Sequence, residues 1–187
     1  MADALKLAQV RFIPGGTPPH RETPRTSAAH RVAMTRLAIT NNPRFALDDR
    51  ETRREGLSYT FDTLTEVRAE VGAATPLVLM MGADAFVKFD TWHQWQAIFE
   101  LANIAVAHRP GASLGAMPPA IAEEVTKRRA TAITGAAGAV FEVPITALDI
   151  SATAIRALVA HGLSTRYLLT PEVQTHITSN HLFLKDN

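Results

Sequence analysis

Residues 76–82 read PLVLMMG, and this apolar stretch decides the fold class. It is too short for a helix and is bounded by a proline and a glycine, which is typical of a strand buried in a parallel sheet. Two similar stretches, VRFIP at 10–14 and NIAVAH at 103–108, also lead into proline-containing turns. We therefore expect parallel strands in the interior of the protein.

Helical patterns fill the sequence between these strands. Strands that alternate with helices predict a doubly wound α/β sheet, which binds its ligand at the carboxyl ends of the strands. We expect one domain over 1–187, with a helical part at 149–187. The remaining expected elements are a helix from Ser27 to about 41, a strand at 45–47, helices at 59–70, 83–88, 94–102 and 118–130, a strand at 139–143, and helices at 151–161 and 171–180.

The composition excludes several classes of protein. Of the 187 residues, 47% are apolar and 20% are charged, which is typical of a globular domain with its own core. The absence of cysteine excludes disulfides, thiolate metal sites and a cysteine nucleophile, and it is what we expect in the reducing cytoplasm. No stretch approaches the roughly eighteen apolar residues of a membrane span. A net charge of +1 argues against nucleic-acid binding through bulk charge.

The charge is nevertheless uneven near the N-terminus. Residues 11–44 contain six arginines and one acid, a local charge of +5, which fits either a solvated face or the rim of a phosphate pocket. The same region contains PGGTPPHR at 14–21, where Gly15 and Gly16 let the backbone approach a ligand. His20 and Arg21 could then meet a phosphate, although an ordinary surface turn also explains the loop.

The stretch DISATAIR, 149–156, carries a second candidate phosphate site. Ser151 stands where a helix N-cap is expected, Thr153 follows two residues later, and Arg156 projects from the second turn. Free backbone N–H groups, two hydroxyls and a guanidinium would together hold a phosphate. The alternative is a capping serine and a surface arginine.

The stretch GADAFVKFDTW, 82–92, follows the buried strand directly. Gly82 and Asp84 stand at the end of that strand, and Trp92 could stack on a flat heterocycle while Trp95 belongs to the core. The SYT stretch at 58–60 offers hydroxyls and helix N-terminal amides, which suit a carboxylate or phosphate, or it is an ordinary cap formed by Ser58.

Several established catalytic motifs are missing from the sequence. It contains no H-E-x-x-H, no Walker loop and no G-x-S-x-G, and its seven histidines lack metal-ligand spacing.

The order of these stretches is more specific than any one of them. The succession IPGGTPPHR, SYT, MGAD, TW, HRPG and ISATAIR resembles the bacterial nicotinate-nucleotide adenylyltransferases, which are HxGH nucleotidyltransferases with a Rossmann-like sheet. The resemblance covers nearly the whole chain. It implies transfer of AMP from ATP to nicotinate mononucleotide, giving deamido-NAD and pyrophosphate, with Mg²⁺. Direct attack by the mononucleotide phosphate needs no protein nucleophile, so the protein would act by positioning and charge stabilisation.

The resemblance also implies a role for each matching residue. Trp92 would stack on the nicotinate ring, the amides of Thr60 and His93 would receive its carboxylate, and His20 and Arg156 would act on the reacting phosphates. The residues expected to bind ATP are Gly82, Asp84, Ile150, Ser151, Thr153 and Arg156. Those expected to bind the mononucleotide are Gly15, Gly16, His20, Arg21, Tyr59, Thr60, Trp92, His93 and Arg109.

Two features depart from the family pattern. Many relatives have asparagine where Gly15 and Gly16 stand, so a side-chain amide contact to the mononucleotide would be lost. The family also begins with a strand and the loop GGTFDPxHxGH, whereas MADALKL at 1–7 matches only the end of the helix that follows that loop. We therefore expect this chain to lack the first strand, most of that helix, and the histidines that stabilise the transferring phosphate.

Two alternatives remain at this point. One is a non-catalytic remnant that binds nucleotide weakly. The other is an adenylyltransferase with a different acceptor, either nicotinamide mononucleotide or phosphopantetheine, against which SYT and TW both argue.

Overall fold

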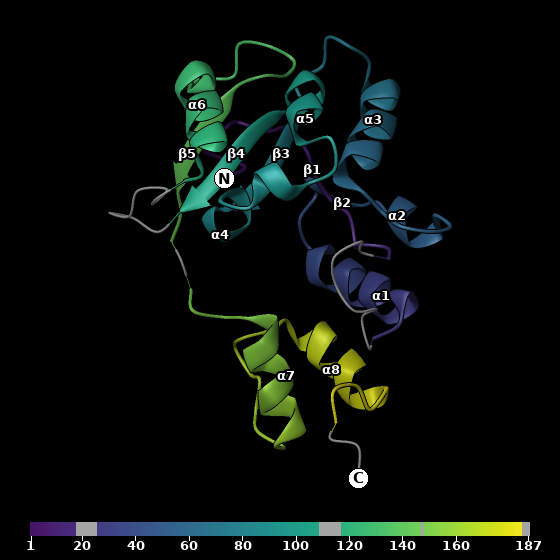
Figure 1. Cartoon of the computed structure of the whole chain (residues 1–187). Helices are drawn as coiled ribbons and strands as arrows, with labels where there is room; N and C mark the ends of the chain where they lie inside the picture. The colour runs from purple at the N-terminus through teal and green to yellow at the C-terminus, as the bar shows by residue number, and fades with distance from the viewer. Residues whose placement is uncertain (18–25, 109–116, 147, 185–187) are drawn as a thin grey trace. The chain divides into compact units, whose positions relative to one another are not determined.

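The computed structural model describes residues 1–17, 26–108, 117–146 and 148–184 (Figure 1). These residues form two compact units. Unit 1 comprises Met1–Leu7 and Ser58–Ala147, and unit 2 comprises Ala8–Leu57 and Leu148–Asn187.

Unit 1 is built on a three-stranded parallel sheet. Its strands are β3 (Val78–Gly82), β4 (Asn103–His108) and β5 (Val140–Pro144), with β4 in the centre. The register pairs Gly82 with Ala107, so the two strands end side by side. The strands expected at 76–82, 103–108 and 139–143 are confirmed within two residues at each end.

The helices of unit 1 all pack on one face of this sheet. They are α3 (Thr60–Val71), α4 (Ala83–Phe86), the 3₁₀ helix η1 (Phe89–Thr91), α5 (Trp95–Leu101) and α6 (Pro119–Arg128). Because side chains alternate along a strand, Ile104 and Val106 of β4 face these helices, whereas Ala105 faces the other side. There Ala105 packs with Phe141 and Val143 in a smaller cluster.

Residues 1–7 help to cover the smaller cluster. Met1 and Leu5 pack against it. The N–H of Leu7 donates to the carbonyl of Ala2 at 2.9 Å, and Lys6, with φ of 51°, donates to Asp3 at 3.1 Å. This is the hydrogen-bond pattern with which many helices end. MADALKL, expected to match the end of a helix, therefore forms a hydrogen-bonded turn.

Arg68 ties the loops of unit 1 together from the last turn of α3. Its guanidinium donates to the carbonyl of Leu101 at 2.9 and 2.5 Å, to Ala136 at 2.9 Å, and also to Gly72 and Thr75. Partial burial lowers the pKa of Arg68 from its ordinary value, but its donors remain satisfied. One side chain thus joins the ends of α3 and α5 to the segment before β5.

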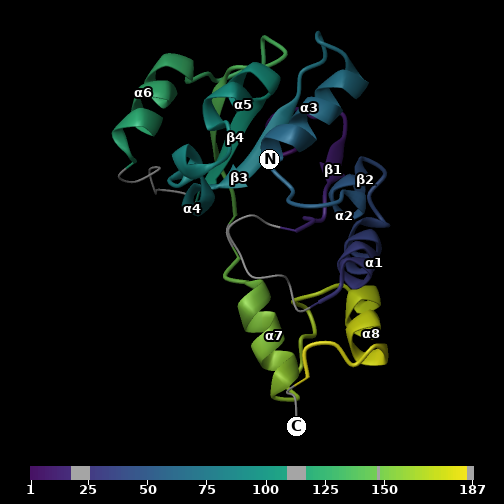
Figure 2. The ribbon, with the colours of Figure 1, turned by 45° about the vertical axis from the view of Figure 1, so that its right-hand side comes forward.

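The described residues of unit 2 form a two-stranded parallel sheet and four helices. Strands β1 (Val10–Phe12) and β2 (Phe45–Leu47) are connected through α1 (Ala28–Ile39), as a parallel pair requires. The hydroxyl of Ser27 caps α1, as expected, by accepting a hydrogen bond from His30 N–H at 3.3 Å. The helix packs against β2 and against α8 (Pro171–Ser179), and Figure 2 shows α1 and α8 side by side. The unit also contains α2 (Arg50–Arg53) and α7 (Ala152–Ala160).

The α/β class with parallel strands is confirmed. The strands form two separate sheets among the described residues, of two and three strands. Helix α2 lies between the strand expected at 45–47 and the helix expected at 59–70, where no helix was predicted. It begins two residues after Asp48, whose carboxylate accepts hydrogen bonds from Arg50, so a side-chain contact helps to hold this short helix.

Candidate active site

The end of β3 brings Gly82 and Asp84 together in unit 1. Gly82 is the N-cap of α4, with an ordinary φ of −79°. A Cβ atom added to it would lie 2.6 Å from Oδ1 of Asp84, so the carboxylate folds back over the glycine. The side chain of Asp84 is exposed, and it therefore presents an acceptor at the carboxyl end of a strand.

A ring contact brings the SYT stretch beside the stretch after η1. The rings of Tyr59 and His93 lie 4.5 Å apart between centroids, at 41°. Tyr59, and not Ser58, occupies the N-cap position of α3, and the Tyr59 side chain makes no capping hydrogen bond. Thr60 is the first residue of α3, where backbone N–H groups have no partner inside the helix. The expected pair of Thr60 and His93 is thus gathered at one helix N-terminus, which favours a bound anion.

Trp92 stands beside this pair in sequence and is half-buried. Its ring packs edge-to-face on buried Phe89, with centroids 5.4 Å apart. Trp95 also contacts Phe89 and additionally Phe99, at 5.9 and 6.2 Å. Trp92 is therefore anchored to the core at its edge while part of the ring reaches the surface, as a stacking platform requires.

In unit 2 the predicted phosphate residues lie at the start of α7. Ser151 is the N-cap, and its hydroxyl accepts a hydrogen bond from Ala154 N–H at 3.1 Å, so the capping interpretation is confirmed. Thr153 and Arg156 are both exposed on the first two turns, and Ile150 is 40% exposed. This helix start can still offer the Thr153 hydroxyl, the Arg156 guanidinium and further backbone N–H groups to a phosphate.

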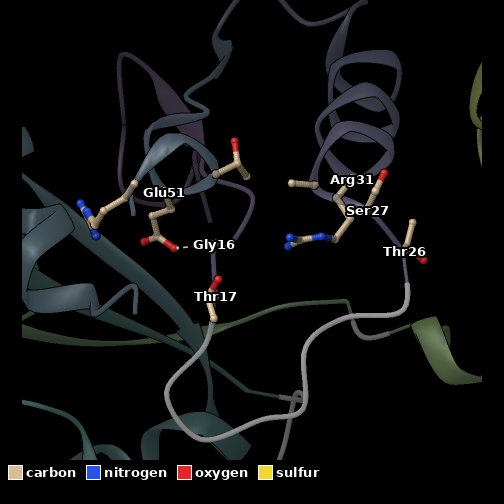
Figure 3. Close-up of a pocket in the computed structure, with 9 residues that line it drawn as sticks. Gly16, Thr17, Thr26, Ser27, Arg31 and Glu51 are labelled. Carbon is tan, nitrogen blue, oxygen red and sulfur yellow. Dashed lines mark hydrogen bonds between the residues drawn. The ribbon is translucent and has the colours of Figure 1, made fainter. Parts of the chain in front are cut away.

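Also in unit 2, the loop after β1 carries Gly15 and Gly16. The N–H of Gly16 donates to Oε2 of Glu51 at 3.3 Å, and Nη1 of Arg31 donates to the carbonyl of Gly15. A pocket of about 190 Å³ lies here (Figure 3), lined by Gly16, Thr17, Thr26, Ser27, Ala28, Arg31, Glu51, Thr52 and Arg54. Sequence reasoning missed both Arg31 and Glu51. Arg31 belongs to the basic region 11–44, but nothing in the sequence indicated Glu51.

A charge cluster fixes the ends of β1 and β2, and the glycine loop follows β1. Asp48 accepts hydrogen bonds from Nε of Arg50 at 2.9 and 2.8 Å, and Nη1 of Arg11 lies 3.8 Å from its carboxylate. Partial burial alone would raise the pKa of Asp48, but the hydrogen bonds and charge of Arg50 outweigh it and hold the pKa below its ordinary value. The backbone N–H of Asp48 donates to Phe12 at 3.0 Å, which joins the end of β1 to the same cluster.

Three expected phosphate contacts, His20, Arg21 and Arg109, lie outside the described residues. Within the part of the chain that the structure describes, no three histidine, aspartate or glutamate side chains gather as metal ligands. None of the described helices is long and apolar enough to cross a membrane.

Comparisons of the sequence with known proteins identify its family. The cytidylyltransferase-like family model matches residues 1–158. A protein of Dechloromonas aromatica named "Probable nicotinate-nucleotide adenylyltransferase" is 45% identical over 185 residues, covering 96% of this chain and 85% of the relative. A protein of the same name from Pseudomonas aeruginosa is 40% identical, covering 98% of this chain and 86% of the relative.

A solved structure is similar in fold. The nicotinic acid mononucleotide adenylyltransferase of Plasmodium falciparum, complexed with NaAD, has a TM-score of 0.67 at 13% identity, covering 94% of this chain and 82% of that one. This likeness supports the α/β architecture. The family model over residues 1–158 and the near full-length relatives at 40–45% identity show that the chain belongs to the cytidylyltransferase-like family and, within it, to the nicotinate-nucleotide adenylyltransferases.

Proposed function

We propose that this protein transfers the AMP group of ATP to nicotinate mononucleotide and releases deamido-NAD and pyrophosphate, a step of NAD biosynthesis. The observation that carries the proposal is the contact between Tyr59 and His93, which brings Thr60 at the start of α3 beside the residue that follows Trp92. That arrangement offers an aromatic ring and free amides to one small aromatic acid. The naming of relatives at 40–45% identity as nicotinate-nucleotide adenylyltransferases supports the same activity.

The mononucleotide end of the site would distinguish a carboxylate from an amide. Trp92 stacks on the nicotinate ring, and the backbone N–H groups of Thr60 and His93 donate to its carboxylate. The N-terminus of α3 carries a partial positive charge, which favours the anionic nicotinate over neutral nicotinamide. Acidic side chains at this place would instead repel the substrate.

Two groups of residues are proposed to bind ATP. The exposed carboxylate of Asp84, held over Gly82, accepts hydrogen bonds from the adenosine. Ile150, Ser151, Thr153 and Arg156 place the start of α7 at the phosphates. The divalent ion, which we propose to be Mg²⁺, enters with ATP and neutralises phosphate charge, in keeping with its preference for substrate phosphates over a cage of protein ligands.

The reaction itself needs no covalent intermediate with the protein. A phosphate oxygen of the mononucleotide attacks the α-phosphorus of ATP, the bond from that phosphorus to the bridging oxygen breaks, and pyrophosphate leaves. His20, Arg21 and Arg109 hold the reacting phosphates, and Arg156 stabilises charge as it moves to the leaving group. Each residue acts by orientation and by charge, and we propose that this takes place in the cytoplasm.

Pyrophosphate release from ATP and nicotinate mononucleotide tests the proposal. We expect deamido-NAD and pyrophosphate in equal amounts, and much less product with nicotinamide mononucleotide or phosphopantetheine as acceptor. Faster turnover with either rival acceptor would overturn the proposed specificity. Turnover only in a form extended at its N-terminus would mean that catalysis requires the HxGH segment, and ATP binding without turnover in either form would favour the non-catalytic alternative.

A further inference from the structure

The Gly15–Gly16 peptide is held from both sides by opposite charges. We propose that Glu51 and Arg31 are positioning residues, which fix the orientation of this peptide so that the glycine loop holds the shape in which the mononucleotide can approach it closely. The inference rests on the proposed function, because it takes the glycine loop to be part of the mononucleotide site. It adds two residues that act through the backbone and do not touch the substrate.

Both hydrogen bonds are made by one peptide unit. The carbonyl of Gly15 and the N–H of Gly16 belong to the same planar amide and point in opposite directions. Nη1 of Arg31, on α1, donates to the carbonyl, and Oε2 of Glu51, on α2, accepts from the N–H at 3.3 Å. Figure 3 shows Arg31 and Glu51 approaching the loop from different segments, with the bond from Gly16 to Glu51 drawn as a dashed line.

The signs of the two charges select one orientation. If the peptide rotated by half a turn, its carbonyl oxygen would face the Glu51 carboxylate and its N–H would face the Arg31 guanidinium. Both contacts would then be repulsive, whereas both are attractive in the observed orientation. A pair of neutral hydrogen-bonding side chains would not discriminate as strongly, because an amide can both donate and accept.

The loop needs side chains that restrict its backbone, because two consecutive glycines leave the backbone unusually free. Left-handed φ angles do not explain these glycines, since neither is among the positive-φ residues of the structure. Among the described residues, a Cβ atom at Gly15 would lie 3.9 Å from Oε2 of Glu51, an ordinary contact distance. At Gly15 the backbone freedom is therefore present without a close steric contact in the described part of the chain, and Glu51 and Arg31 restrict the Gly15–Gly16 peptide.

Arg31 and Glu51 also border the same pocket. Both line the space beside Gly16, Arg31 from α1 and Glu51 from α2. The pair therefore lies where the glycine loop meets the pocket.

Kinetics of Glu51→Ala and Arg31→Ala test the inference. A loosened loop must be ordered again on binding, so we expect KM for nicotinate mononucleotide to rise about tenfold, with kcat and KM for ATP nearly unchanged. Glu51→Gln keeps an acceptor for Gly16 and should give a smaller rise. Glu55→Ala and Arg36→Ala are matched controls, because both residues are exposed and lie on the same segments as the pair.

Hydrogen exchange at the Gly16 amide provides a readout that does not depend on activity. Exchange should quicken in Glu51→Ala and stay at the wild-type rate in Glu55→Ala, with both variants folded by circular dichroism. The inference is overturned if Glu51→Ala leaves both the exchange rate and KM for the mononucleotide unchanged, or if it lowers only kcat. If the wild-type chain does not use nicotinate mononucleotide at all, the proposed function fails. Separately, an unchanged exchange rate of the Gly16 amide in Glu51→Ala would refute the inference that Glu51 holds the Gly15–Gly16 peptide.

Discussion

Substituting Gly82 by alanine should damage ATP binding without damaging the fold. The backbone tolerates alanine, because φ at this position is −79°. The new Cβ, however, would lie 2.6 Å from Oδ1 and 3.8 Å from Cγ of Asp84. The first distance is far below van der Waals contact, so the Asp84 carboxylate must rotate away.

The two consequences of that rotation differ in size. Asp84 is exposed, so a change of rotamer costs the fold about 0.5–1.5 kcal/mol at most. A hydrogen bond from the adenosine to a charged carboxylate is worth about 1.5–3 kcal/mol, and its loss should raise KM for ATP roughly 10- to 150-fold. KM for nicotinate mononucleotide should change little.

A double-mutant cycle makes the reasoning refutable. If Gly82→Ala acts only by displacing Asp84, the double variant with Asp84→Ala should bind ATP no worse than Asp84→Ala alone. Asp84→Asn keeps one acceptor oxygen and serves as the milder companion. Additive losses in the double variant, or an unchanged KM for ATP in Gly82→Ala, would show that Asp84 does not contact the nucleotide.

Three further changes probe other parts of the molecule. Trp92→Ala should raise KM for nicotinate mononucleotide about tenfold or more, since stacking is worth about 1–3 kcal/mol, and an unchanged KM would assign Trp92 to the core alone. Arg68→Ala leaves the carbonyls of Leu101 and Ala136 without their donor and should lower the free energy of unfolding in urea by about 1–3 kcal/mol, whereas a loss under 0.5 kcal/mol would contradict its role as a tie. The pKa of Asp48 lies below its ordinary value of 3.8 in the folded protein, so its stabilising contribution is complete at neutral pH and is lost as the pH falls through the folded pKa. Urea titrations from pH 7 to pH 3 should therefore show a steeper loss of stability in the wild type than in Asp48→Asn, and parallel curves would refute this.

Much of the fold could be predicted because its signals are local. The run PLVLMMG and the alternation within β4 indicate buried strands from short-range pattern alone, and Ser27 and Ser151 mark helix starts through their own side chains. Helix α2 escaped prediction because it has only four residues and an adjacent side-chain contact helps to hold it.

The candidate site was less accessible to sequence reasoning because its contacts join distant segments. SYT indicated amides near a helix start, but only the folded chain sets Tyr59 against the His93 ring. SYT equally suggested a cap by Ser58, whereas the structure makes Tyr59 the N-cap. Glu51 acts on the backbone of Gly16, a partner that no pattern of residue types encodes.

The alternation along β4 also has a consequence for variation in this family. Ile104 and Val106 fill the larger cluster and Ala105 the smaller one, so a slip of β4 by one residue would exchange bulky and small side chains between the two faces. Such a slip would also move Ala107 out of its pairing with Gly82. The end of β4 would then lie at a different position relative to Asp84, which follows Gly82. The order of large and small side chains in β4 therefore fixes the position at which this strand ends beside Gly82, in addition to filling the core.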